Sequence, residues 1–405
     1  MEAATRHTTV ATDGVLLSYT LVGSGPTKVL CIPGMCTPGS MWAPQVAAFL
    51  AGGNVSMALV DNRGSGLSET PWAHALAWHG GYSTDQLARD AWSVAAAAGW
   101  TGAVHICGHS LGGMIAQRAA VQRPSAVASL CLLATHDGNA GGAGWFGWPP
   151  RLCLPGGVLR AVLAVVGGAD VISTLLGLHY TQMFLDELVP DEQVAEGEAD
   201  DRGGGVNSVA AASMAAAVAG VGSPALNATL VASTTGLASR PACPSHQRTG
   251  HTVSPPTPPP PRPTTAPPPL RPRREVYQRR YRRPGPSPPR PDGFWGHLAA
   301  VLTHGLAATE VTRLAAAGFP ILVVAGSADE VVPLSAAAAL ATRLGGRLLV
   351  VPAAHFVADE AAVAVNDAMQ RAWAVGEAWA ARAPATGTGC GGGGVLRVMS
   401  SPALA

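Results

Sequence analysis

The stretch Cys107-Gly108-His109-Ser110-Leu111-Gly112-Gly113 carries the pattern Gly-x-Ser-x-Gly. An apolar run typical of a buried strand, residues 103–107, precedes it, and helix-forming residues follow at positions 114–122. A strand, a sharp turn and a helix in this order form a nucleophile elbow, in which the serine side chain stands free at the turn. The sequence therefore predicts that Ser110 is a nucleophile at the carboxyl end of a strand.

Two glycines make this turn possible. Gly108 and Gly112 have no Cβ, so the backbone can fold tightly enough to hold Ser110 at a strained corner. Ser110 would then lie at the head of the following helix, where backbone N–H groups favour developing negative charge. We interpret His109, beside the nucleophile, as a packed neighbour rather than a catalytic residue.

A serine nucleophile needs a base and an acid, and the chain offers both after strand-like runs. A histidine has to accept the serine proton, and a carboxylate has to fix the tautomer of that histidine. Asp329 follows the apolar run 320–325, and His355 follows the run 347–352. Ligands bind beyond the carboxyl ends of parallel strands, so we expect Ser110, Asp329 and His355 to converge there.

Three other carboxylates remain alternatives for the acid. Glu330 is adjacent to Asp329, Asp359 lies just after His355, and Asp137 follows the strand-like run 127–134.

The negative charge that forms during acyl transfer needs two backbone N–H groups. One is expected from Leu111, the residue after the nucleophile. The other is expected in the loop after Ile32, at Met35, and Gly34 would let that backbone approach the substrate carbonyl.

Apolar strand-like runs alternate with helical segments along most of the chain. We expect strands at residues 15–22, 28–32, 55–60, 103–107, 127–134, 320–325 and 347–352. We expect helices at residues 42–50, 82–99, 114–122, 335–344 and 359–382. This alternation predicts a doubly wound, mostly parallel α/β sheet that is covered on both faces.

Composition narrows the classes of partner. The chain has 405 residues, of which 48% are hydrophobic and 13% are charged, and its formal net charge is +1. A charge so near zero argues against nucleic acid or a membrane surface as a partner. Residues 158–178 are interrupted by charge and residues 203–239 are too polar, so we expect no stable membrane insertion. Residues 1–12 do not resemble a signal peptide, which favours a cytoplasmic location.

The seven cysteines form no CxxC pair, which argues against a zinc site and a disulfide framework. The predicted chemistry needs no metal and no organic cofactor. Nothing in the sequence indicates the oligomeric state.

The pattern divides the chain into five parts. Residues 14–136 and 293–383 form the two halves of the core, and residues 137–202 form a cap that includes Trp145 and Trp148. Residues 203–292 are low-complexity and rich in proline and arginine, so we expect a long disordered insertion. Two alternatives for this insertion stay open, a gene-model artefact and an arginine-rich interaction arm. Residues 384–405 are expected to form a disordered tail.

Taken together, the motifs resemble those of the α/β-hydrolase superfamily, and more narrowly those of uncharacterised plant and algal serine α/β-hydrolases. The resemblance covers residues 14–201 and 293–373 and skips the insertion. It is carried by these segments: Ile32-Pro33-Gly34-Met35, Asp61-Asn62-Arg63-Gly64-Ser65-Gly66-Leu67-Ser68, Gly108-His109-Ser110-Leu111-Gly112-Gly113, Leu178-His179-Tyr180-Thr181-Gln182, Gly293-Phe294-x-Gly296-His297, Gly326…Asp329…Pro333 and His355.

The resemblance implies the α/β-hydrolase fold and a triad in the order Ser110, Asp329, His355. It also implies that Asp61 and Arg63 tie loops together beneath the site. Many members of the superfamily have His-Gly where this chain has Pro33-Gly34, which leaves the second oxyanion donor less defined. A serine at position 110 argues against epoxide hydrolases and haloalkane dehalogenases, which use an aspartate there.

The sequence thus predicts a serine hydrolase that cleaves an ester, lactone, thioester or amide of a small apolar substrate through an acyl-Ser110 intermediate. Two alternatives keep the same fold and triad. One is a ligand receptor or interaction protein with slow or no turnover, and the other is an acyltransferase.

Overall fold

The core of the molecule is one eight-stranded sheet with the strand order β1-β2-β4-β3-β5-β6-β9-β10. The computed structural model describes residues 4–50, 52–71, 82–138, 170–190, 270–282 and 291–382. The strands are β1 (Thr5–Val10), β2 (Leu16–Val22), β3 (Thr27–Ile32), β4 (Val55–Val60), β5 (Val104–His109), β6 (Val127–Leu133), β9 (Ile321–Gly326) and β10 (Arg347–Val351). β1 and β2 run antiparallel to their neighbours, and the other strands are parallel. The doubly wound, mostly parallel sheet is confirmed.

The central strands are apolar throughout because both of their faces are covered. Every residue of β4, β5 and β9 is buried. In β3, Leu30 and Ile32 belong to one hydrophobic core, while Val29 and Cys31 belong to the core on the opposite face. Continuous apolar runs of this kind are what a parallel sheet between two helical layers requires.

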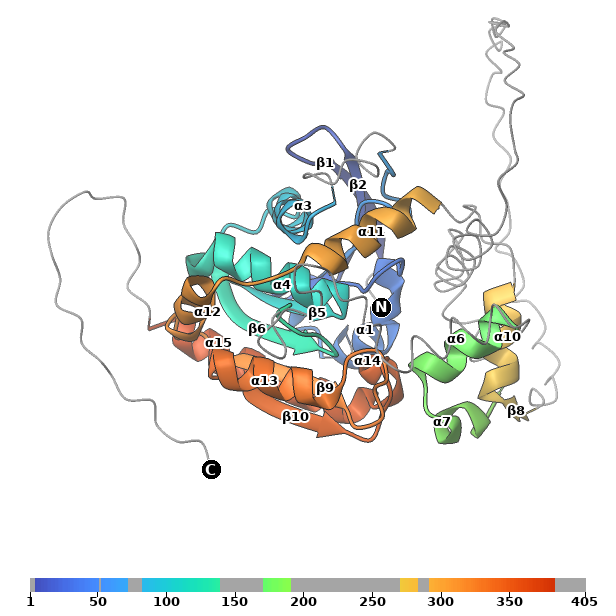
Figure 1. The fold of residues 1–405 in the computed structure, drawn as a ribbon. Helices are drawn as coiled ribbons and strands as arrows, with labels where there is room; N and C mark the ends of the chain where they lie inside the picture. The colour runs from blue at the N-terminus through green and yellow to red at the C-terminus, as the bar shows by residue number, and fades with distance from the viewer. Residues whose placement is uncertain are drawn as a thin grey trace, which may run out of the picture.

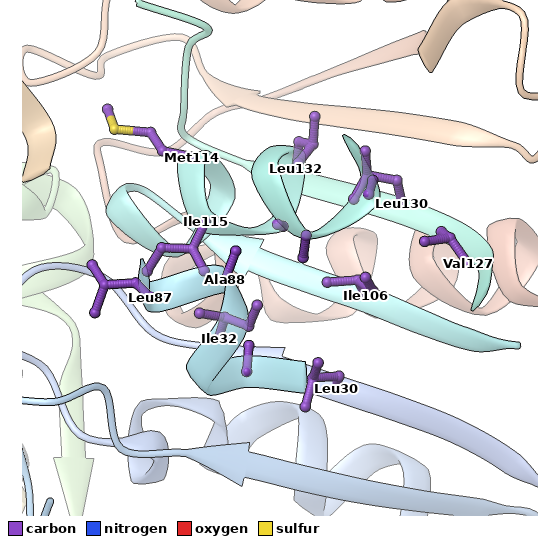
Figure 2. Close-up of a cluster of buried hydrophobic side chains, with 14 of the residues drawn as sticks. Leu30, Ile32, Leu87, Ala88, Ile106, Met114, Ile115, Val127, Leu130 and Leu132 are labelled. Atoms are coloured by element: carbon purple, nitrogen blue, oxygen red, sulfur yellow. The ribbon is translucent and has the colours of Figure 1, made fainter. Parts of the chain in front are cut away.

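Helices cover the two faces unequally. One core contains side chains of α3 (Thr84–Ala97), α4 (Leu111–Gln122), α11 (Pro291–Thr303), α12 (Ala308–Ala315) and α13 (Leu334–Leu344). The other contains side chains of α1 (Ala43–Leu50), α14 (Val357–Glu360) and α15 (Ala362–Ala380). Short 3-10 turns, η1 (Gly39–Trp42) and η2 (Pro124–Ala126), complete this part of the chain. Figure 2 shows part of the first core, where side chains of α3 and α4 meet those of β3, β5 and β6.

A small second group of elements lies outside the sheet, and we call it the cap. It consists of α6 (Val171–His179), α7 (Gln182–Asp186), β7 (Leu188–Pro190), β8 (Leu270–Pro272) and α10 (Arg273–Arg282). β7 pairs with β8. α10 packs against α6 and α7 (Figure 1).

The cap corrects the expected extent of the insertion. Residues 270–282 were expected to be disordered with the rest of 203–292, but they form β8 and α10. Two arginines of α10 have partners there: Arg273 pairs with Glu187 and lies 3.7 Å from the ring centre of Phe184, and Arg274 pairs with Asp186. Val276, on the same helix, is buried and adds apolar surface to the packing of the cap. A composition that is too polar to fold alone is therefore ordered by the neighbouring cap elements.

Some expected features lie outside the described residues, and others differ in detail. Trp145, Trp148, the insertion over 203–269 and the tail at 384–405 lie outside them. The long helix expected at 359–382 is divided into α14 and α15 at Ala361, whose φ of −117° and ψ of 35° are not helical. β1, which carries no buried residue, was not predicted. No helix within the described ranges is long and apolar enough to cross a membrane.

Candidate active site

Ser110 lies between β5 and α4 in a backbone conformation that residues with side chains rarely adopt. Its φ is 54° and its ψ is −119°. The Ser110 N–H donates to the carbonyl of Leu133 at 2.8 Å, and the Ser110 carbonyl accepts from the Thr135 hydroxyl at 2.8 Å. A strained residue persists only where its surroundings fix it, and strained residues cluster at functional sites. Hydrogen bonds to both the N–H and the carbonyl of Ser110 therefore fix the backbone of this turn.

The two glycines of the elbow stand where no side chain fits. A Cβ on Gly112 would come within 2.1 Å of the Ile32 carbonyl oxygen, and a Cβ on Gly108 within 2.2 Å of the Gly112 carbonyl oxygen. Close backbone approach thus explains both positions.

Three side chains from three strand ends meet at the elbow. The Ser110 Oγ lies 2.9 Å from the His355 Nε2, and the His355 Nδ1 lies 2.9 Å from the Asp329 Oδ2. Asp329 follows β9 and His355 follows β10, and their side chains are 1% and 4% exposed. The structure brings together the three residues that the sequence singled out.

Electrostatics favour an ionised Asp329. Burial alone would raise the pKa of Asp329, but the charge and hydrogen bond of His355 lower it, as do N–H groups of Val332 and Val331. Both of these N–H groups donate to the Asp329 Oδ1 at 2.8 Å. The net pKa lies below the usual 3.8, so the carboxylate accepts the His355 Nδ1–H. That tautomer leaves the Nε2 lone pair facing the hydroxyl of Ser110.

The alternative acids are engaged elsewhere. Asp359 accepts hydrogen bonds from the hydroxyls of Tyr180 and Tyr277 at 2.9 and 3.0 Å. Asp137 forms an ion pair with Arg343, and the side chain of Glu330 is exposed. Of the four carboxylates weighed from the sequence, Asp329 is shown in hydrogen-bond contact with the His355 Nδ1, at 2.9 Å.

The loop after β3 passes directly beside the nucleophile. A Cβ on Gly34 would lie 3.4 Å from the Ser110 Cβ and 3.1 Å from the His109 Nδ1. Met35 is half-buried against both the main core and Phe294, and Leu111 begins α4 with its side chain fully buried. The loop and the helix start thus flank Ser110, and the oxyanion role of the Met35 and Leu111 N–H groups stays a prediction.

His109 does more than pack against its neighbours. Burial and the adjacent His355 lower its pKa to about 3, so the ring is neutral at pH 7. Its Nε2 lies 2.9 Å from the His355 carbonyl oxygen, which can only accept, so this nitrogen carries the proton. His109 thereby holds the backbone of the residue that contacts Ser110.

The cap supplies a residue that sequence reasoning missed. The ring of His179, at the end of α6, lies 5.7 Å from that of His355, and its carbonyl accepts from the Phe356 N–H at 3.1 Å. The resemblance included His179 in a motif but gave it no place at the site. Its position depends on how the cap packs, and no local pattern encodes that.

Further contacts join the cap to the loop that carries His355. Glu360 accepts hydrogen bonds from Thr181 of the cap, and its Oε2 also accepts from the Ala354 N–H at 3.0 Å. The ring of Tyr180 stacks on that of Phe356 at 5.3 Å. The cap therefore rests directly on the residues either side of His355.

Within the described part of the chain, no group of three or more His, Cys, Asp or Glu is placed so that it could hold a metal ion. Cys31, Cys36, Cys107 and Cys131 are free and buried, and burial raises the pKa of the Cys31, Cys36 and Cys107 thiols.

Comparisons with known proteins bear on the fold that carries these residues. Residues 27–152 match a family model described as the alpha/beta hydrolase fold. A curated relative from Variovorax paradoxus, RutD, whose name assigns it provisionally to carbamate hydrolysis, is 34% identical over 105 residues, which cover 26% of this chain. The match covers only 36% of the length of that relative.

Solved structures of similar fold cover most of the chain. An esterase from Exiguobacterium antarcticum superimposes with a TM-score of 0.54 at 16% identity, covering 91% of this chain and 98% of its own. An enol-lactonase from Burkholderia xenovorans gives a TM-score of 0.52 at 18% identity, covering 91% of this chain and 100% of its own. At these identities the likeness shows the fold alone.

Proposed function

We propose that this chain, which belongs to the α/β-hydrolase superfamily, is a serine hydrolase that acts through an acyl-Ser110 intermediate. The observation that carries the proposal is the chain of contacts from Ser110 through His355 to Asp329, each 2.9 Å long. The strained backbone at Ser110 supports the proposal, because such strain costs folding free energy and strained residues cluster at active sites.

The reaction begins when the Ser110 oxygen attacks the substrate carbonyl carbon. His355 takes the serine proton at Nε2, and Asp329 stabilises the imidazolium through Nδ1–H. The carbonyl oxygen becomes negative and is met by the N–H groups of Leu111 and Met35. The carbon–leaving group bond then breaks, and His355 returns the proton to the leaving group. A water molecule, deprotonated by His355, then attacks the acyl carbon. The bond to the Ser110 oxygen breaks, His355 returns the proton to that oxygen, and the carboxylic acid is released.

The proposed substrate is a small, largely apolar ester or lactone, with thioesters and amides as further members of the class. The rings of His179 and Phe356 border His355, and the half-buried Met35 lies in the loop beside Ser110. The ring of Phe356 and the side chain of Met35 are apolar and would contact the groups on either side of the scissile bond.

The test is covalent labelling of the folded protein with a fluorophosphonate, together with hydrolysis of p-nitrophenyl esters of graded chain length. Wild type should label and turn over, whereas Ser110→Ala and His355→Ala should do neither. A folded wild type that does not label would overturn the proposal and favour the receptor alternative. Faster release of the acyl group to added alcohols or amines than to water would identify an acyltransferase.

A further inference from the structure

His297, on α11, lies at the site although it stands far from it in the sequence. The mechanism above gives no task to the segment Gly293–His297. The side chain of His297 is fully buried, and its ring joins the loop after β3, which borders the elbow, to the loop after β4 that carries Arg63. Its Nδ1 accepts the Cys36 N–H at 2.9 Å, and its Nε2 lies 2.8 Å from the Arg63 carbonyl oxygen.

The charge and tautomer of His297 follow from these two partners. Burial lowers its pKa to about 4, so the ring is neutral at pH 7. A backbone N–H can only donate and a carbonyl can only accept, so Nδ1 is the bare nitrogen and Nε2 carries the proton. Both ring nitrogens are therefore used, and the ring has a single orientation that satisfies them.

The Cys36 N–H belongs to the loop that carries the proposed oxyanion donor. Cys36 has a φ of 56°, which is unfavourable for a residue with a side chain, so the loop needs outside support to keep this shape. The peptide that joins Met35 to Cys36 is the one that His297 grips. The preceding peptide is gripped from the other side, because the Thr37 hydroxyl donates to the Gly34 carbonyl at 3.0 Å.

These two contacts fix the direction of the Met35 N–H. In a trans peptide the carbonyl of Gly34 and the N–H of Met35 point in opposite directions. Because Thr37 holds that carbonyl, the Met35 N–H points away from Thr37, and His297 prevents the next peptide from rotating to undo this. The Asn62 side chain also donates to the Pro33 carbonyl at 3.1 Å, so the loop is held at three points.

The glycines of the same segment let α11 approach closely enough for this reach. A Cβ on Gly293 would come within 2.1 Å of the Gly64 carbonyl oxygen, and a Cβ on Gly296 within 2.3 Å of the Tyr82 ring. Gly293 and Gly296 thus allow the close approach of α11 that places His297 between the two loops.

We propose that His297 is a positioning residue that holds the Met35 N–H in the oxyanion hole. The inference rests on the proposed serine-hydrolase function. His297 touches no reacting atom, so its loss should lower the rate of the chemical step rather than the affinity for the substrate. Removal of an oxyanion donor costs about 100- to 1,000-fold in kcat, and a misplaced donor should cost part of that.

The experiment compares His297→Phe with His297→Gln. Phenylalanine keeps a planar ring but neither hydrogen bond, whereas the glutamine amide carries one acceptor and one donor and can replace both. Active sites are counted by fluorophosphonate labelling, and kcat is expressed per labelled site. We expect His297→Phe to lose about 10- to 100-fold in kcat with KM within about 3-fold, and His297→Gln to recover most of the loss.

A tetrahedral inhibitor gives a second readout that a general loss of stability would not move. The inhibition constant of an alkyl boronic acid should rise in His297→Phe in proportion to the loss of kcat, because the adduct places an oxygen in the oxyanion hole. The matched control is His105→Phe, since His105 is also buried, with a pKa lowered to about 4, but lies at the far end of β5. It should leave kcat per site and inhibitor affinity unchanged.

Each outcome separates this inference from the function on which it rests. If His297→Phe keeps the wild-type kcat per site, or if His297→Gln is no better than His297→Phe, the positioning role is overturned while the hydrolase stands. If wild type neither labels nor turns over, the function fails and the inference fails with it. Should His297→Phe not fold, the smaller His297→Leu makes the same comparison with His297→Gln.

Discussion

At the scale of single residues, the site depends on which proton each histidine carries. Asp329 orients His355 through Nδ1, His109 holds its carbonyl, and Ser110 meets its Nε2. In each contact the partner group determines which ring nitrogen of the histidine carries the proton. The arrangement of the site therefore depends on the tautomer of each histidine as well as on its position.

The substitution Asp329→Asn tests this directly. An amide in place of the carboxylate can donate to Nδ1 and so favours the wrong tautomer of His355, which should lower kcat by about 1,000- to 10,000-fold with little change in KM. Steady-state kinetics on a p-nitrophenyl ester measure it. Asp359→Asn, which alters a carboxylate bound to two tyrosines, should cost less than about 10-fold. Equal losses in the two variants would contradict the assignment of the acid.

At the scale of elements, the elbow depends on close contact between β3, β5 and the start of α4. Gly112 lies against the Ile32 carbonyl of β3, and Gly108 lies against Gly112 itself. The strand, turn and helix could be predicted because glycine spacing and apolar runs are local features. The cap could not, because α10 packs through contacts with Phe184 and Asp186 of α7 and with Glu187, which directly follows α7.

A matched pair of glycines tests the elbow. Gly112→Ala would force its new methyl group into the Ile32 carbonyl oxygen at 2.1 Å, and we expect it to lower the free energy of unfolding by more than about 2 kcal/mol. Gly102→Ala, an exposed position with nothing within 4 Å, should be neutral or stabilising by less than about 1 kcal/mol. Urea unfolding of both variants measures the difference, and similar midpoints would argue against a closely packed elbow.

At the scale of the whole molecule, several buried histidines are held neutral. Burial lowers the pKa of His105, His136 and His297 to about 4 and that of His109 to about 3. In the unfolded chain the same groups titrate near 6.5. Between these values the unfolded state binds more protons than the folded state, so stability falls as the pH falls.

This linkage predicts marked acid sensitivity well above the pKa range of the carboxylates. Between pH 7 and pH 5.5 each of the four histidines should remove about 1 kcal/mol from the free energy of unfolding. Burial raises the pKa of Asp61 and Asp90 above the usual 3.8, so the folded state binds more protons at these two groups and they oppose the trend as the pH falls. Urea unfolding at the two pH values is the measurement, and equal midpoints would show that these histidines are not held neutral.

Sequence reasoning reached the sheet and the three central residues of the site because each follows a strand, and strand ends converge by a general rule. It did not reach contacts made across the fold. His297 meets Cys36 across 261 positions, and His109 meets the carbonyl of His355 across 246. Nothing local in the sequence distinguishes such a histidine from one that merely packs. The half-exposed β1 was missed for a related reason, since a weakly apolar edge strand has no clear periodicity.

The measurement that tests the central claim most directly is mass spectrometry of the protein quenched in acid seconds after mixing with a short-chain p-nitrophenyl ester. We expect a mass increase of one acyl group, mapped to Ser110, in wild type and none in Ser110→Ala. In Asp329→Asn the adduct should form far more slowly. Turnover without any adduct, or an adduct that persists in Ser110→Ala, would contradict an acyl-Ser110 intermediate.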